Sequence, residues 1–196
     1  MTRAAVLEGA RELFVERGFD ATSVDEIARA SEVSKGAVYH HFSDKKQLFA
    51  ELFSEVQGSV MRTVTEVAAA ADTDWQQAVE AARTFLRSYA ADESARVILR
   101  QAPAVLGQER IREIDEKVAL PFVRGLLEHL RDTGQLQPVP VVTTARMIFG
   151  LLCEATTLVT EGADPSSASE EAETVMLFML GGLLRTPQTS GPPAQA

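Results

Sequence analysis

Residues 22–49, with the sequence TSVDEIARASEVSKGAVYHHFSDKKQLF, constrain the fold of this chain more than any other segment. Ser23 precedes Glu26 by three positions and stands directly before an apolar pattern, which is the spacing of a capping box at a helix N-terminus. The helix that it opens is predicted to end near Ala30. A short capped helix followed at once by a second helix is typical of a helix-turn-helix.

The connector and the second helix complete this motif. Ser31 to Val33 have the length of a helix-turn-helix connector, and Ser34 supplies the N-cap of a helix that runs to about Phe42. Val38 and Phe42 have helical spacing, so both can face inward. The residues left toward solvent are small, aromatic or basic, namely Lys35, Gly36, Ala37, Tyr39, His40 and His41. A face of this composition suits a nucleic-acid groove better than it suits water.

The residues around this motif match a known family. The segment from Ala5 to Phe53 resembles the DNA-binding domain of the TetR family of transcriptional repressors, and the resemblance covers roughly the first quarter of the chain. The resemblance rests on four linked pieces, "FVERGF", "TSVDEIA", "VSKGAVYHHF" and "SDKKQLF".

The resemblance implies which residues contact DNA. Lys35 and Gly36 lie where family members touch base edges, and the glycine leaves room for close approach of the backbone. Tyr39 and Lys45 match the family's phosphate-binding tyrosine and lysine. The full set of expected DNA contacts is Thr22, Ser23, Ser34, Lys35, Gly36, Ala37, Tyr39, His40, His41 and Lys45.

Simpler interpretations stand beside these roles. Helix capping alone explains Thr22 and Ser23, and Tyr39 can be a half-buried packing residue. The adjacent His40 and His41 suggest a metal site, but side chains of neighbouring residues diverge on a helix. No metal is therefore expected there.

The charge of the chain is distributed unevenly. The net charge of −9 argues against nucleic acid, since phosphate binding normally needs a basic surface. Residues 1–50 contribute only −1, however, and the segment from Ser34 to Lys46 holds three lysines, two histidines and a single acid. A small basic patch is therefore expected within an acidic protein.

No targeting segment is expected. The first residues contain Glu8 and lack a long apolar core, so they do not form a secretory signal. The longest apolar runs, Met147 to Cys153 and Met176 to Leu184, are shorter than the roughly 20 residues that span a membrane. The single cysteine, Cys153, fits a reducing compartment. We expect a soluble cytoplasmic protein with no membrane partner.

An all-α fold of about nine helices is predicted, because no stretch alternates as a strand does. Apolar spacing continues from Leu48 to Val60, which predicts a long fourth helix that joins the first part of the chain to the rest. A later helix, from Gln108 to Thr133, contains Pro121. Proline lacks a backbone donor, so it is expected to kink this helix or divide it in two.

Two final helices, at about residues 142–161 and 165–184, are expected to pack as an antiparallel pair. The later part of the second is apolar on nearly all sides and needs cover on several of them. We expect these helices to form a homodimer interface with the same helices of a second chain, as in the resembled family. The alternative is that both belong only to the core of the monomer.

Three regions are predicted along the chain. They are a helix-turn-helix DNA-binding domain at residues 1–47, a helical effector-binding and dimerisation domain at 48–185, and a disordered tail at 186–196 that is rich in Pro, Gly and Ser.

The second region is expected to bind an unknown small-molecule effector beside the bend at Pro121. The candidate lining residues are Trp75, Phe85, Tyr89, Arg100, Phe122, Met147, Phe149 and Cys153. The alternative for each is an ordinary place in the core or on the surface. An apolar neighbourhood raises the pKa of a thiol, which disfavours Cys153 as a redox sensor.

These features favour a DNA-binding transcriptional regulator. The leading interpretation is a repressor that binds a palindromic double-stranded DNA operator as a homodimer and is released by a small molecule. The alternative is a DNA-binding regulator or activator with no ligand. An enzyme is not expected, because two of the three histidines lie on the exposed helix and no Gly-rich phosphate loop or metal-spaced cluster occurs. No cofactor is expected.

Overall fold

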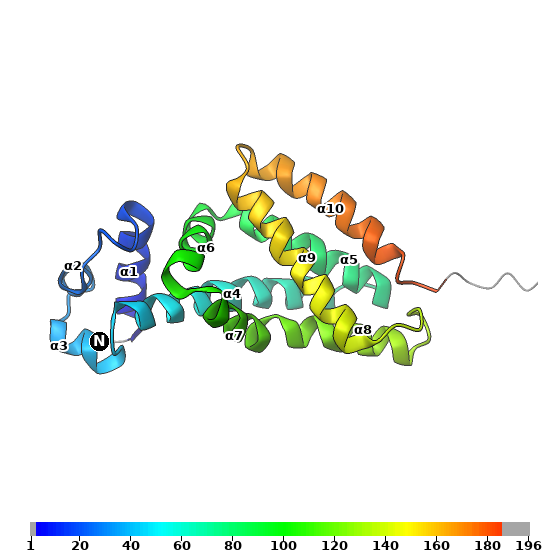
Figure 1. Ribbon diagram of the computed structural model, residues 1–196, viewed down its shortest axis with the longest axis horizontal. Helices are drawn as coiled ribbons and strands as arrows, with labels where there is room; N and C mark the ends of the chain where they lie inside the picture. Colours follow the sequence, from blue (N-terminus) through cyan, green and yellow to red (C-terminus); the bar gives the residue numbers. More distant parts are fainter. Residues whose placement is uncertain (1–2, 186–196) are drawn as a thin grey trace, which may run out of the picture.

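The structure, a computed structural model, describes residues 3–185, and these form ten helices. The first three make a small head at one end of the molecule, the fourth reaches from the head into the body, and the remaining helices complete an elongated body (Figure 1). The head helices are α1 (Arg3–Arg17), α2 (Val24–Ala30) and α3 (Lys35–His41). The all-α prediction is confirmed for the described part of the chain. The predicted disordered tail, residues 186–196, lies outside the described residues.

Aromatic rings hold the head together. Phe14 of α1 and Phe19 of the following loop pack with Phe49, their ring centroids 5.4–5.5 Å apart. Gly18 ends α1 with φ +83°, a left-handed conformation that glycine adopts without strain, and its N–H bonds the Phe14 carbonyl at 3.0 Å. The "FVERGF" piece is therefore a helix C-cap followed by a core residue.

The turn between α2 and α3 lies close against α1. A Cβ added to Gly9 would overlap the Ser31 hydroxyl, so any other residue at that position of α1 would have to displace Ser31. Glu32 in the turn has φ +54°, which reverses the chain direction between the two short helices. The Val33 N–H then bonds the Ala28 carbonyl at 2.9 Å and closes the turn.

Helix α4 (Lys45–Ala69) joins the head to the body. Its first turns place Leu48 and Phe49 in the head core, and its later turns place Val60 and Val64 in the body. Helix α5 (Asp74–Ala91) packs along it. The predicted long fourth helix is thus observed as one element shared by both parts.

The segment with Pro121 is divided into two helices, α7 (Gln108–Val118) and α8 (Leu120–Asp132), preceded by α6 (Glu93–Leu106). Pro121 occupies the first turn of α8, where its missing N–H costs nothing. The sequence allowed a kink or a division, and the division raises the helix number from the predicted nine to ten.

Helices α9 (Val141–Glu161) and α10 (Pro165–Gly181) form the predicted antiparallel pair on one side of the body (Figure 1). The prediction that α10 reaches residue 184 was wrong. The chain leaves the helix at Gly181, and Leu184 instead pairs with Leu136 in an isolated antiparallel bridge. Gln135 and Gln137 exchange backbone hydrogen bonds with Arg185 and Leu183, which fixes this end of the body.

Helix α9 is, by length and composition alone, apolar enough to cross a membrane, with a mean hydropathy of 1.3 over its most apolar window. The prediction from uninterrupted apolar runs did not anticipate this, because a few polar residues separate the runs. In the structure α9 packs against α5, α8 and α10. The helical core therefore accounts for the buried part of its apolar surface, which is 39% of that window.

Candidate nucleic-acid interface and body cavities

The helix-turn-helix is fixed by side-chain caps. Ser23 accepts a hydrogen bond from the Glu26 N–H at 3.2 Å, while the Ser23 N–H donates to the Glu26 carboxylate at 2.8 Å. This reciprocal pair is the predicted capping box. Ser34 likewise accepts from the Ala37 N–H at 3.2 Å and begins α3. Both hydroxyls therefore already accept a backbone hydrogen bond in the free protein.

The outer face of α3 matches the face predicted from the sequence. Val38 and Phe42 are buried, whereas Tyr39 is 48% exposed and both histidines lie on the surface. The rings of His40 and His41 are 5.2 Å apart at their centroids. This exposed face carries side chains that can form hydrogen bonds, next to Lys35 at the start of the helix.

Gly36 has open space around it. A Cβ at this position would meet only Ser34 Oγ, at the ordinary contact distance of 3.8 Å. The fold of the isolated chain therefore gives no steric reason for glycine here.

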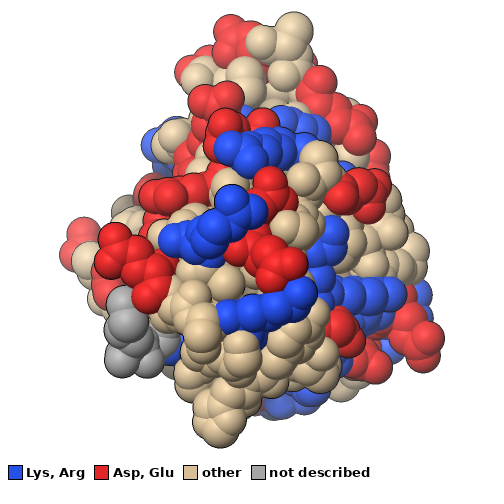
Figure 2. Space-filling model, turned by 90° about the vertical axis from the view of Figure 1, so that its left-hand side faces the viewer, with Lys and Arg blue, Asp and Glu red and all other residues tan. Residues whose placement is uncertain are grey.

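Lys35 at the start of α3 forms an ion pair across the motif. Its Nζ is 2.9 Å from the Asp25 carboxylate on α2, and this hydrogen bond raises the pKa of the lysine. Figure 2 shows the head from its outer end, where Lys and Arg side chains alternate with Asp and Glu side chains. The expected basic patch is therefore interrupted by acids. Phosphate groups must compete with these acids for the cations.

Lys45 and Thr22 serve the fold of the head. Lys45 Nζ donates to the carbonyls of Phe19 at 2.7 Å and Thr22 at 2.8 Å, and lies 4.1 Å from the centre of the Phe19 ring. The Thr22 hydroxyl donates to the Gly18 carbonyl at 2.8 Å, and the residue is only 2% exposed. Lys45 thus ties the start of α4 to the loop between α1 and α2.

The body contains a cavity of about 570 Å³, which we call the polar cavity. It is bounded by α4, α5, α6, α7 and α9, and a volume of this size is usual for a small-molecule site. Among its lining residues are Phe53, Gln57, Phe85, Tyr89, Arg100, Arg112, Asp115, Glu116, Arg146, Phe149, Cys153, Thr156, Thr160 and Glu161.

A chain of buried hydrogen bonds crosses one wall of the polar cavity. The Tyr89 hydroxyl donates to Gln57 Oε1 at 2.7 Å, and Gln57 Nε2 donates to Asp115 Oδ1 at 2.9 Å. Burial raises the pKa of Asp115 to about 7 and also raises the pKa of Tyr89. Burial and the nearby Asp115 carboxyl raise the pKa of Cys153 to about 12, so its thiol stays protonated.

The charged groups at the rim of the polar cavity are partly satisfied by the protein. Arg100 donates to the Thr160 carbonyl on α9 at 2.9 Å. Arg146 forms an ion pair with Glu116 at 2.9 Å. These side chains are exposed to solvent, in contrast to Asp115, which is 7% exposed. Asp115 is thus the buried acid of the cavity.

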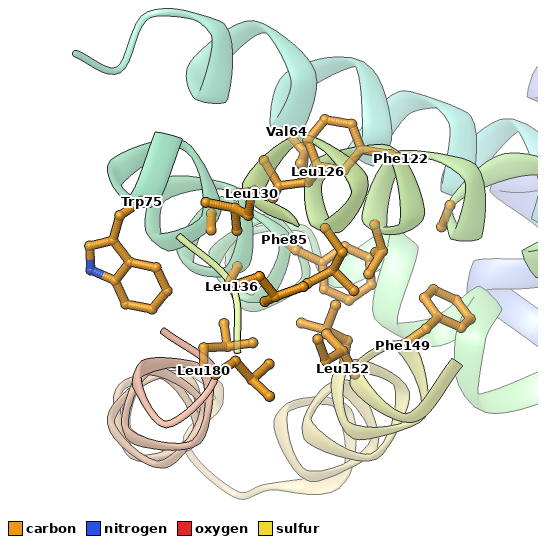
Figure 3. A pocket seen from close by; sticks show the side chains of 18 of the residues that line it. Val64, Trp75, Phe85, Phe122, Leu126, Leu130, Leu136, Phe149, Leu152 and Leu180 are labelled. Atoms are coloured by element: carbon orange, nitrogen blue, oxygen red, sulfur yellow. The ribbon is translucent and has the colours of Figure 1, made fainter. Parts of the chain in front are cut away.

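A second, apolar cavity of about 60 Å³ lies beside the polar cavity, and Phe85 and Phe149 line both. Figure 3 shows apolar side chains from α4, α5, α8, α9 and α10 converging on it, with Trp75 at one side. Its wall is almost free of polar groups, so it offers packing surface rather than hydrogen bonds.

The structure brings most of the predicted effector residues to these two cavities. Tyr89, Arg100 and Cys153 line the polar cavity, Trp75 and Phe122 line the apolar cavity, and Phe85 and Phe149 line both. Met147 is 67% exposed on the outside of α9 and lines neither.

Two further residues of the polar wall, Gln57 and Asp115, were not predicted from the sequence. Gln57 interrupts the apolar stripe of α4, which is a detectable signal, because a buried amide requires partners. Asp115 lies among exposed charges on α7 and gives no such signal, since only the packing of α7 against α4 buries it.

A capped helix-turn-helix with a buried inner face, attached through one long helix to a helical body with a cavity, defines a helix-turn-helix regulator. Two family models match the chain: "Bacterial regulatory proteins, tetR family" at residues 6–52 and "Tetracyclin repressor-like, C-terminal domain" at residues 75–183. The chain therefore belongs to the TetR family of transcriptional regulators. It is a DNA-binding regulator and not an enzyme.

Curated relatives share part of this chain. The Transposon Tn10 TetC protein of Escherichia coli is 30% identical over 128 residues, which are 63% of this chain and 60% of that protein. The HTH-type transcriptional repressor AcnR of Corynebacterium efficiens is 40% identical over 65 residues, 33% of this chain and 35% of that protein. The matches thus span less than two thirds of these relatives.

Solved structures resemble nearly the whole chain. A TetR-family transcriptional regulator from Pectobacterium atrosepticum is 28% identical, with a TM-score of 0.80, and the match covers 95% of both chains. The transcriptional regulator FadR from Bacillus subtilis, solved in complex with stearoyl-CoA, is 21% identical with a TM-score of 0.73, covering 90% of this chain and 98% of that one. The second likeness concerns the fold alone.

Proposed function

We propose that this protein is a ligand-responsive repressor that binds a near-palindromic DNA operator as a homodimer and leaves it when a small molecule fills the body. The observation that carries the proposal is that α4 belongs to both parts of the chain. Its start forms part of the head core, and its residues Phe53 and Gln57 line the polar cavity. Occupancy of the cavity can therefore bias the position of the head.

The proposed DNA surface is the outer face of α3 with the helix starts beside it. Lys35 and Gly36 face base edges and Tyr39 a phosphate, because these residues are exposed at the front of the motif. Lys45 has two of its three donors engaged by backbone carbonyls, which leaves one for a phosphate. The remaining contacts in the proposal are Ser23, Ser34, Ala37, His40 and His41. Thr22, which the sequence also suggested, is left out because it is only 2% exposed and its hydroxyl bonds the Gly18 carbonyl.

The proposed dimer interface is the outer face of α9 and α10. Large apolar side chains are exposed on these two helices in the single chain, and Phe178 is 85% exposed. The others are Val142, Met147, Leu158, Val175 and Met179. Soluble proteins rarely expose so many large apolar side chains on two neighbouring helices, which supports a second copy as their cover.

The proposed effector site is the polar cavity together with the apolar cavity. Its candidate residues are Trp75, Phe85, Tyr89, Arg100, Phe122, Phe149 and Cys153, to which we add Gln57 and Asp115. The complex of FadR with stearoyl-CoA is a precedent for a small molecule in a protein of this fold. We further propose a domain division near residue 47, within the first turn of α4, and a cytoplasmic location.

The test is selection of DNA fragments from the source genome, followed by fluorescence anisotropy over a salt series. We expect one inverted-repeat sequence and a steep fall of affinity with salt, because phosphate contacts release counterions. Weak binding that is independent of sequence would overturn the repressor proposal. Loss of the selected complex on addition of extracts containing small molecules would then test the ligand response separately.

A further inference from the structure

The polar cavity contains one buried acid without a cationic partner. Asp115 accepts a hydrogen bond from Gln57 at 2.9 Å, and within residues 3–185 no Lys, Arg or His forms an ion pair with it. A carboxyl group has two oxygens that can each accept hydrogen bonds. Since Asp115 lines the cavity, its remaining acceptor capacity is available to a molecule inside it.

The neighbouring hydrogen bonds fix the direction of this acceptor. Tyr89 donates to Gln57, and the Gln57 amide in turn donates to Asp115. Both hydrogen bonds of this series are donated in the direction of the carboxyl group, so Asp115 is the final acceptor. Tyr89 and Gln57 are themselves buried, and their burial holds the hydrogen-bonded side chains in one arrangement.

The cavity wall around this acid suits a positive charge. Four aromatic rings line the same space, those of Phe53, Phe85, Tyr89 and Phe149. The faces of aromatic rings attract cations, and the attraction is stronger where water is excluded. Burial also raises the pKa of Asp115 to about 7, because removal from water makes the carboxylate costly to form.

The arginines at the rim do not cancel this preference. Arg100 is directed to the Thr160 carbonyl and Arg146 to Glu116. Arg112 is exposed, and Glu116 and Glu161 stand at the same rim. Charges in contact with water are screened, whereas a buried charge acts at lower dielectric, so an ionised Asp115 acts more strongly on a ligand inside the cavity than these exposed side chains do.

From this arrangement we infer that the effector is an amphipathic organic amine, whose ammonium group binds Asp115 and whose apolar part packs against Phe85 and Phe149. This assignment rests on the proposed function, because it names the class of ligand for the same cavity. The ammonium ion supplies both the donor and the charge that Asp115 lacks. Phe85 and Phe149 also line the apolar cavity, so a longer apolar tail extends in that direction.

The experiment compares three probes with one tail and different end groups: phenylbutylamine, phenylbutanol and phenylbutyrate. Binding to the full chain is measured by isothermal titration at about pH 8, where Asp115 is ionised and the amine is protonated. We expect the amine to bind at least about tenfold more tightly than the alcohol, and the carboxylate to bind most weakly.

The decisive variant is Asp115→Asn, which keeps an oxygen for the Gln57 hydrogen bond and removes the charge. It should lose about tenfold or more in amine affinity and leave the alcohol unchanged. The matched control is Glu113→Gln on the same helix, whose carboxylate is 49% exposed and paired with Arg110. This control should bind all three probes like the unaltered protein, and thermal unfolding verifies that both variants fold.

Three results would overturn the amine assignment. They are equal or tighter binding of the alcohol or the carboxylate, amine binding that survives Asp115→Asn, and the absence of binding by all three probes. Preference for phenylbutyrate would point instead to an anionic amphiphile held by the rim arginines. Because the operator selection uses none of these probes, failure here leaves the repressor proposal to its own test.

Discussion

Gln101 of α6 holds the N–H of Phe19 in the head: its Oε1 accepts that hydrogen bond at 2.7 Å. The same amide donates to the carbonyl of Phe14, at the end of α1, at 3.0 Å. Its neighbour Arg100 lines the polar cavity and bonds α9. Consecutive residues of α6 therefore contact the cavity and the head.

Replacing Gln101 by Ala removes this link. The Phe19 N–H loses its partner, so we expect the free energy of unfolding to fall by about 1–3 kcal/mol and the Phe19 amide to exchange hydrogen faster. Denaturant unfolding and amide exchange measure the two effects. Gln108→Ala, an exposed glutamine at the start of α7, is the control and should change neither. Unchanged exchange at Phe19 in Gln101→Ala would show that the link contributes nothing.

Gly36→Ala is expected to separate stability from DNA binding. Alanine fits without a clash and favours a helix, so the free protein should be more stable by roughly 0.5–1 kcal/mol. The added methyl group would stand between α3 and the bases, so operator affinity should fall. Gly125→Ala in α8, where a Cβ also meets open space, should stabilise the protein without affecting operator binding. Retained affinity in Gly36→Ala would remove this residue from the proposed interface.

Substitutions of Lys35 and Lys45 are expected to affect DNA binding in different ways. Lys35→Ala should relax base preference, whereas Lys45→Ala should weaken binding to every sequence and lower the salt slope by about one. Because Lys45 also bonds two carbonyls, its removal should lower the stability of the head as well. Lys46→Ala, an exposed neighbour, is the stability control. Equal effects of Lys35→Ala on selected and random DNA would contradict base reading.

Local signals made the head predictable. The Ser23 and Glu26 spacing, the Ser34 cap and the glycine after α1 each depend on residues close in sequence, and each was found where expected. The double role of Lys45 was not foreseen, because it depends on the Phe19 and Thr22 carbonyls being folded back beneath α4.

The cavity chemistry was less accessible to sequence reasoning. Aromatic residues such as Phe85 and Phe149 were named because large apolar side chains in the body are natural lining. Asp115 was missed, since its burial arises only when α7 packs on Gln57 of α4, 58 positions away. Met147 was named from its apolar character, but helical phase places it on the outer face of α9.

Asp115 should make stability depend on pH. Its pKa is about 7 in the folded state against 3.8 ordinarily, so the folded protein holds a proton that the unfolded chain releases. The protonated Asp115 therefore adds to the free energy of unfolding. This stabilisation is complete below about pH 4 and is lost as the pH rises to about 7, a change of up to roughly 4 kcal/mol.

Asp115→Asn removes this titration. Its stability relative to the unaltered protein should therefore rise between about pH 4 and pH 7 and stay constant above. Urea unfolding across this range measures the difference, with Glu113→Gln as the exposed control. A difference that does not vary with pH would mean that Asp115 is ionised in the folded protein throughout.

Phe178→Glu tests the proposed dimer. In the single chain Phe178 is 85% exposed, so a carboxylate there should not unfold the protein, but it should place two charges in an apolar interface. We expect the dissociation constant of the dimer to rise at least about thirtyfold, because central aromatic residues dominate such interfaces. Sedimentation equilibrium measures this constant.

A matched control separates this effect from the mere addition of charge. Val67→Glu places the same side chain at an exposed apolar position of α4, a helix outside the proposed interface, and should leave dimerisation unchanged. A monomeric Phe178→Glu variant should also bind an inverted repeat no better than a single half-site, because two heads are no longer held at one spacing. A dimer of unaltered strength in this variant would place the subunit contact elsewhere, and the apolar face of α10 would then need a different partner.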